Sequence, residues 1–163
     1  FDVDAITLNP LMGFDTLKAF SSHESKAIYV LTLTSNPGAA DFLKQAFVGY
    51  DMMAQYISER LRELSTNYET HLGMVIGATQ AELSASITSL HKEGALLIPG
   101  VGAQGGSIDE LAKALKNHTG IPLINSSRGI IYAGSDQEDW VDHVAKKAEE
   151  TQKSLNIITQ NYV

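Results

Sequence analysis

The apolar residues of this chain gather in five short runs, and each run ends in polar or glycine-rich residues. Most runs are continuously apolar rather than alternating, which is typical of parallel strands that are covered on both faces. The pattern therefore predicts five buried strands, at Ala5–Leu8, Ala27–Leu33, Gly73–Ile76, Ala95–Ile98 and Leu123–Ile124.

Helical patterns separate these runs. The longest is expected from Asp41 to Leu64, where apolar positions recur at a spacing that fits one helix face. Asn36 before Pro37 offers an N-cap with proline at the first helical position. Capping boxes, in which a hydroxyl and a carboxylate satisfy free backbone amides, predict three more helix starts. They are Thr79–Glu82, Ser107–Glu110 and Ser135–Glu138.

Strands and helices thus alternate, which predicts an α/β fold with a parallel sheet and a single domain over residues 1–163. Two architectures share this pattern. One is an open, doubly wound sheet of the flavodoxin-like kind. The other is part of a parallel (β/α)8 TIM barrel, whose complete form needs about 250 residues. Chain length favours the open sheet, whereas the composition of the loops favours the barrel.

Functional residues collect in both architectures where strands end and helices begin. The five strand-end loops are rich in Gly, Ser, Asn and Thr, and Arg128 is their only basic residue. None of them offers a Lys, His, Asp or Glu as a general acid or base. Local sequence therefore predicts binding of a phosphorylated small molecule and stops short of a reaction. The loops are residues 9–13, 34–38, 77–79, 99–107 and 125–129.

The fourth loop carries the strongest signal, because four glycines surround Gln104 just before the helix expected at Ser107. Glycine permits close backbone approach, so several N–H groups can converge on an anion. The next loop adds Ser127, Arg128 and Gly129, and consecutive loops of this kind hold phosphate in TIM barrels. The alternatives are a flexible turn for the glycines and a surface ion pair for Arg128.

The other loops offer groups that can hydrogen-bond a planar heterocycle. Ser35 and Asn36 follow the longest strand, although helix capping by Asn36 and a polar strand end at Ser35 explain them equally well. Asn9 and Thr79 are weaker candidates for ligand contacts. Trp140 is expected in the core or docked against a helix. All five histidines are expected on the surface without metal-ligand spacing, at positions 23, 71, 91, 118 and 143.

Composition narrows the functional classes further. Formal net charge is −7, from 12 Lys+Arg against 19 Asp+Glu, which argues against non-specific binding to nucleic acid or anionic membranes. Absence of cysteine excludes disulfides and thiolate metal sites and is compatible with a cytoplasmic location. No apolar stretch has the length of a membrane span. Because Phe1 leads almost directly into a strand, the chain is expected to be a cut piece.

Four of these stretches resemble orotidine 5'-monophosphate decarboxylase, in the longer-chain bacterial and protist subgroup. They follow the family's order across essentially the whole chain, and the third and fourth are specific when found together. The matching stretches are residues 4–10, 34–38, 98–106 and 125–130.

This resemblance implies a (β/α)8 barrel that works as a homodimer without metal or organic cofactor. It implies conversion of orotidine 5'-monophosphate to UMP and CO2 in pyrimidine synthesis, with this chain supplying strands four to eight. Ser35 would face the pyrimidine, Gln104 would bridge pyrimidine and phosphate, and Asn9 would lie near the ligand. Asn36, which follows Ser35, is also a candidate for binding the substrate. The implied phosphate-binding residues are Gly105, Ser127, Arg128 and Gly129.

One departure from the family is large. The family's reactive groups form an Asp-x-Lys-x-x-Asp run, and none of the nine lysines here stands in such a run. The resemblance implies that these groups lie upstream of Phe1, in a missing N-terminal segment of the same enzyme, and that the fragment alone is inactive. The alternatives are another phosphate-binding TIM-barrel enzyme and a non-enzymatic, flavodoxin-like module or adaptor.

Overall fold

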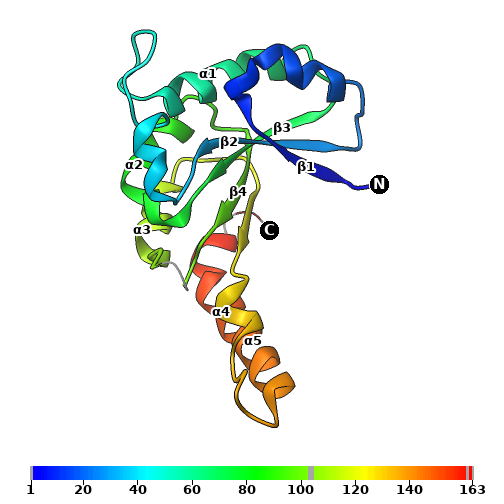
Figure 1. Ribbon diagram of the computed structural model, residues 1–163, viewed down its shortest axis with the longest axis vertical. Helices are drawn as coiled ribbons and strands as arrows, with labels where there is room; N and C mark the ends of the chain where they lie inside the picture. The colour runs from blue at the N-terminus through cyan, green and yellow to red at the C-terminus, as the bar shows by residue number, and fades with distance from the viewer. Residues whose placement is uncertain (1, 103–104, 161, 163) are drawn as a thin grey trace.

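The computed structural model describes residues 2–102, 105–160 and 162, and its centre is one parallel sheet of five strands (Figure 1). Each strand pairs in parallel with the next one along the chain. The expected five strands are confirmed, and the last three are slightly longer than their apolar runs. The strands are β1 (Ala5–Leu8), β2 (Ala27–Leu33), β3 (His71–Ile76), β4 (Ala95–Pro99) and β5 (Pro122–Asn125).

Strand order separates the two architectures. A doubly wound sheet reverses at a switch point, so its strands do not follow one another in sequence order. Here the order is β1-β2-β3-β4-β5, as in a TIM barrel. Right-handed crossovers then put every connecting helix on the same face. The helices α1 (Met53–Ser65), α2 (Ala81–Thr88) and α3 (Ile108–Ala114) do lie on one side (Figure 1). The chain is therefore a partial barrel, and the open sheet is excluded.

The two faces of the sheet differ in burial. One row of paired residues contains Val30, Met74 and Leu96, which are fully buried under the helices. The next row contains Leu123, whose side chain is 52% exposed. Full burial of both faces, as the apolar runs predicted, thus holds for β3 but not for β5. In a barrel this second face is the interior.

The helix expected from Asp41 to Leu64 is half as long, because α1 begins at Met53. Before it, Phe47 and Tyr50 form an isolated antiparallel bridge around a tight turn. Val48 and Gly49 take positive φ angles of 48° and 86° in this turn, which no helix tolerates. The apolar spacing before Met53 comes from a folded-back loop rather than from a helix face.

Helix starts were predicted with mixed success. The Ser107 hydroxyl caps α3, and Pro37 follows Asn36 into a short 3-10 helix at Pro37–Asp41. The Thr79 box is wrong, because a 3-10 helix at Ala78–Gln80 comes first and α2 begins at Ala81. The Ser135 box is also wrong. A turn at Gly134 precedes α5 (Trp140–Thr159), which packs against the short α4 (Arg128–Ile131). Two further 3-10 helices follow β1, at Pro10–Met12 and Phe14–Phe20.

The Ser107→Ala change is expected to destabilise the fold by about 1 kcal/mol, because the Ser107 hydroxyl accepts the Glu110 amide at 3.3 Å. The measurement is the free energy of unfolding in urea. Ser86→Ala is the matched control, since the exposed Ser86 hydroxyl only bonds back to Leu83 within α2. Equal losses in both variants would show that the cap contributes nothing of its own.

Two of the histidines expected on the surface are buried instead. His91 is 5% exposed and His118 is 6% exposed, because the loop before β4 docks on the loop before β5. The Lys92 carbonyl oxygen accepts the backbone amides of Thr119 and Gly120 at 2.9 Å each. Trp140 is the reverse case: of its two expected positions, in the core or docked against a helix, the core is wrong, because Trp140 is 52% exposed at the start of α5.

None of the helices in the described part of the chain combines the length and the hydropathy of a membrane-spanning segment.

Candidate functional site

The carboxyl ends of β2, β3 and β4 surround a hollow of about 360 Å³. Three strand-end loops contribute its lining, so the fold brings Ser35, Asn36 and Thr79 together as the sequence suggested. Every lining side chain is uncharged, which suits a neutral, hydrogen-bonding ligand. The lining consists of Thr34, Ser35, Asn36, Thr79 and Pro99.

Ser35 is distinguished by its hydroxyl group. The Ser35 Oγ atom is buried, and it has no hydrogen-bond partner in residues 2–102, 105–160 and 162. Burying a hydroxyl without a partner costs about 1–3 kcal/mol. An unsatisfied hydroxyl in the wall of a hollow is therefore a candidate contact for a ligand.

Asn36 occupies the N-cap position of its 3-10 helix, yet its side chain makes no capping bond. Its Oδ1 atom instead accepts the Thr34 hydroxyl at 2.6 Å. The side-chain capping expected for Asn36 is therefore wrong. Thr34 was not singled out from the sequence, although a hydroxyl two residues from an Asn in non-helical backbone is a known source of such local bonds.

The loops after β4 and β5 lie side by side. The Ser126 hydroxyl donates to the Val101 carbonyl oxygen at 2.9 Å, and Val101 forms a bridge with Gly106 that closes the fourth loop. Gly102 and Gly105 have φ angles of 81° and 84°, a conformation that favours glycine. Adjacency of these two loops agrees with the expected phosphate site. Gln104, the central residue of the expected site, lies outside the described residues.

Arg128 is exposed at the start of α4, one residue after Ser127. Arg128 forms no ion pair with any residue that the structure describes, so the surface ion pair considered as its alternative role has no support there. Ser127 is exposed and Gly129 is half-buried beside it. The guanidinium is thus available to an anion at the strand-end face.

Asn9 is already engaged, because its Oδ1 atom accepts the Leu11 amide at 3.0 Å and caps the first 3-10 helix. Asn9 is not among the residues that line the hollow. The structure therefore does not bring Asn9 together with Ser35 and Asn36.

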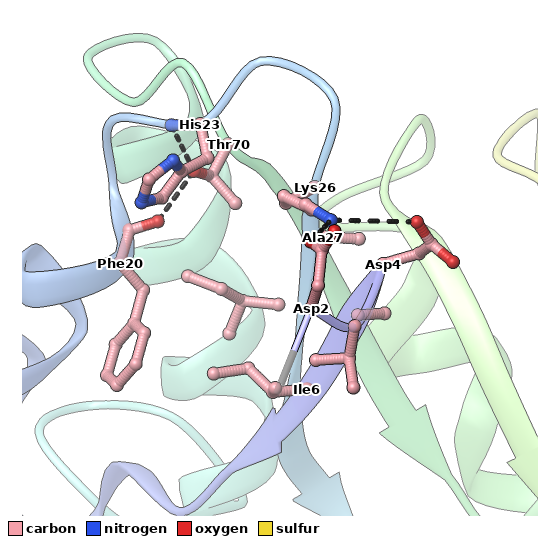
Figure 2. Close-up of a pocket in the computed structure, with 11 residues that line it drawn as sticks. Asp2, Asp4, Ile6, Phe20, His23, Lys26, Ala27 and Thr70 are labelled. Atoms are coloured by element: carbon pink, nitrogen blue, oxygen red, sulfur yellow. Dashed lines mark hydrogen bonds and ion pairs between the residues drawn. The ribbon is translucent and has the colours of Figure 1, made fainter.

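A second hollow, of about 300 Å³, lies at the opposite ends of β1 and β2 (Figure 2). Its one lysine, Lys26, bonds Asp2 at 2.9 Å and lies 3.7 Å from Asp4. The bond to Asp2 raises the pKa of Lys26 and lowers the pKa of the Asp2 carboxyl. Thr70 bridges the Phe20 carbonyl oxygen and the His23 amide beside it. Because its cation is neutralised, this hollow is a poor anion site.

Metal ligation has no support from geometry. In the part of the chain that the structure describes, no three His, Cys, Asp or Glu side chains lie close enough to hold a metal ion. The chemistry available at the strand ends is hydrogen bonding to a neutral ring and attraction of an anion by Arg128.

Comparison with protein families gives a match over residues 1–142 to the model described as "Orotidine 5'-phosphate decarboxylase / HUMPS family". Among curated proteins, the chain is 36% identical over 155 residues to orotidine 5'-phosphate decarboxylase of Halobacterium salinarum. It is 40% identical over 160 residues to the protein of that name from Natronomonas pharaonis. Each match covers 94% of this chain, which spans only 58% and 56% of those two relatives.

Solved structures agree with the sequence comparisons. UMP synthase of Leishmania donovani superposes with a TM-score of 0.76 at 31% identity, covering 96% of this chain and 33% of that one. OMP decarboxylase of the same organism gives a TM-score of 0.71 at 27% identity, covering 94% of this chain and 58% of that one.

Proposed function

Because this chain belongs to the orotidine 5'-phosphate decarboxylase / HUMPS family, we propose that it forms the nucleotide-binding part of an orotidine 5'-monophosphate decarboxylase. One observation carries the proposal: the uncharged hollow with the unsatisfied Ser35 hydroxyl opens at the same sheet end as the two linked loops with Arg128. A pyrimidine nucleotide has both matching parts, a planar ring with an amide edge and a phosphate.

Residue roles follow from this proposal. Ser35 bonds the amide edge of the pyrimidine, and Asn36 stands beside it with its side chain held by Thr34. Gln104 bridges the pyrimidine and the phosphate. Asn9 is assigned a place near the ligand at the end of β1 but no side-chain contact, because its side chain caps the first 3-10 helix. The proposed phosphate-binding residues are Gly105, Ser127, Arg128 and Gly129.

In the proposed reaction the bond between C6 and the carboxylate of orotidine 5'-monophosphate breaks, CO2 leaves, and a proton is delivered to C6 to give UMP. Residues of this chain contribute by binding the phosphate and the ring, since remote binding energy can be used to stabilise a transition state. The sequence holds no Asp-x-Lys-x-x-Asp run to deliver the proton. We therefore propose that the 163-residue chain by itself binds the nucleotide without turning it over.

The wider setting belongs to the same proposal. The chain is one domain, strands four to eight of a TIM barrel, and the complete enzyme is a cytoplasmic homodimer. Support for the strand numbering comes from the sequential parallel sheet and from structural relatives of which this chain covers only a part.

The test is a comparison of ligand affinities by calorimetry. UMP is expected to bind about tenfold or more tightly than ribose 5-phosphate, because the ring adds at least one hydrogen bond. Equal affinities would instead favour an enzyme of sugar phosphates. Decarboxylation of orotidine 5'-monophosphate by the purified 163-residue chain alone would contradict the assignment of its chemistry to other residues.

A further inference from the structure

At Gly77 a neighbouring residue, and not the backbone conformation, leaves no room for a side chain. Its φ of −66° and ψ of 137° lie in the extended region that every residue adopts. Its amide donates to the Leu33 carbonyl oxygen at 2.8 Å, which holds the end of β3 against the end of β2. The backbone alone would therefore accept alanine at this position.

The space next to Gly77 is filled by Ser35. A Cβ atom at Gly77 would overlap the Ser35 hydroxyl oxygen, and it would lie 2.9 Å from the Ser35 nitrogen and 3.0 Å from the Ser35 Cβ. The same hydroxyl is buried and unsatisfied within the described part of the chain. Two observations thus concern the same oxygen atom: Gly77 leaves the space for it free, and no group in the described residues forms a hydrogen bond with it.

The residues on either side of Ser35 are held by local contacts. The Thr34 hydroxyl bonds Asn36 on the other side of Ser35, and Pro37 follows immediately. A buried hydroxyl without a hydrogen-bond partner is unfavourable in a folded protein. Such an arrangement is retained where a ligand atom completes the hydrogen bond.

We propose that Gly77 is a positioning residue for recognition of the nucleobase, acting through the Ser35 hydroxyl. This inference rests on the proposed function and adds a specificity role to a residue that need not touch the ligand. A side chain at position 77 takes the space of the Ser35 hydroxyl and forces that hydroxyl out of its present position beside the hollow. The phosphate loops after β4 and β5 are left in place. Gly77 therefore governs selectivity for the base and not affinity for the phosphate.

The experiment compares Gly77→Ala, Ser35→Ala and the double variant with the unchanged protein, using UMP and ribose 5-phosphate as probes in calorimetry. Gly77→Ala is expected to weaken UMP binding by about tenfold or more, the effect of losing one hydrogen bond to a ligand. Ribose 5-phosphate affinity should stay within about twofold. The double variant should bind UMP no more weakly than the weaker single variant, because both changes remove the same contact.

Gly106→Ala is the matched control. An added Cβ at Gly106 is also crowded, 2.5 Å from the Ala78 Cβ, but it lies in the glycine-rich loop. This change should weaken UMP and ribose 5-phosphate alike. A Gly77→Ala protein that binds UMP as the unchanged protein does, or that loses both ligands equally, overturns the inference.

A second variant tests the inference if Gly77→Ala does not fold. Ser35→Gly combined with Gly77→Ala removes the two Ser35 side-chain atoms that the new Cβ would meet. It should fold and bind ribose 5-phosphate while UMP affinity stays low. If it binds UMP as tightly as the unchanged protein does, the Ser35 hydroxyl makes no contact with the base and the role assigned to Gly77 is wrong. If the unchanged protein shows no preference for UMP, the proposed function fails as well.

Discussion

Lowering the pH from 7 to 4 is expected to destabilise the fold by about 3 kcal/mol through His118. Burial lowers the pKa of His118 from 6.5 to about 4, and the nearby His91 adds to the shift. The Gly94 carbonyl oxygen raises the pKa of His118 and so opposes the effect of burial. Its effect is the smaller one, and neither ring nitrogen of His118 has a hydrogen-bond partner within the described residues. Between these two values the unfolded chain binds a proton that the folded chain excludes. This stability is therefore complete above pH 6.5 and is lost as the pH falls toward 4.

The measurement is urea unfolding between pH 7 and pH 4 for the unchanged protein and for His118→Gln. The variant should lose about 3 kcal/mol less over this range. His91 is the second buried group, with a pKa that burial lowers; Glu93 in its own loop and Arg62 and Glu59 of α1 also act on it. His23→Gln, at an exposed position, is the control and should follow the unchanged protein. If His118→Gln lost as much stability between pH 7 and pH 4 as the unchanged protein, the acid sensitivity would come from other groups.

Replacing Arg128 with alanine is expected to weaken nucleotide binding by roughly 2–4 kcal/mol, which is about thirtyfold to a thousandfold in affinity. Arg128 is the only basic residue in the strand-end loops, and it is exposed without an ion pair in the described structure. A guanidinium can hold a phosphate with two parallel hydrogen bonds. UMP and ribose 5-phosphate should lose affinity equally, in contrast to the effect of Gly77→Ala.

The test uses titrations of both ligands, with the free energy of unfolding measured alongside. Arg60→Ala is a matched control, because Arg60 is paired with Glu63 on α1 and stacks 5.8 Å from the centre of the Phe14 ring. It should leave nucleotide affinity unchanged. Arg128→Lys should recover part of the binding, since lysine keeps the charge but not the two-pronged geometry. Full affinity in Arg128→Ala would rule out the proposed phosphate contact.

Sequence reasoning succeeded where the determining contacts are local. The bounds of β1 and β2 were predicted residue for residue, because each is a run of apolar residues interrupted only by one threonine, a residue that strands favour. The strand ends then identified Ser35, Asn36 and Arg128 as candidates. Local patterns could not decide between capping and ligand binding at Asn36, since that depends on whether the Thr34 hydroxyl turns toward it.

Two kinds of feature could not be predicted from the sequence: contacts between distant segments, and a reversal of the chain inside an apolar pattern. His91 and His118 are buried because two loops dock on each other, an event that the periodicity of either segment does not encode. The false helix before Met53 arose because Val48 and Gly49 turn the chain back on itself. The role proposed for Gly77 could not be predicted from its strand end, since it depends on Ser35 in the loop after another strand.

The sequential order of the sheet also bears on how the chain acquires its structure. β1 pairs with β2 through Ala5 and Ala27, and β4 pairs with β5 through Leu96 and Pro122, so each pairing joins neighbours along the chain. Pairing of neighbours keeps the loop between two paired strands as short as a parallel connection allows, so a sheet of this kind can grow by one strand and helix at a time. The α1–α2 and α2–α3 contacts extend the same order to the helices. Each added strand would pair with the edge strand of the unit directly before it in the chain.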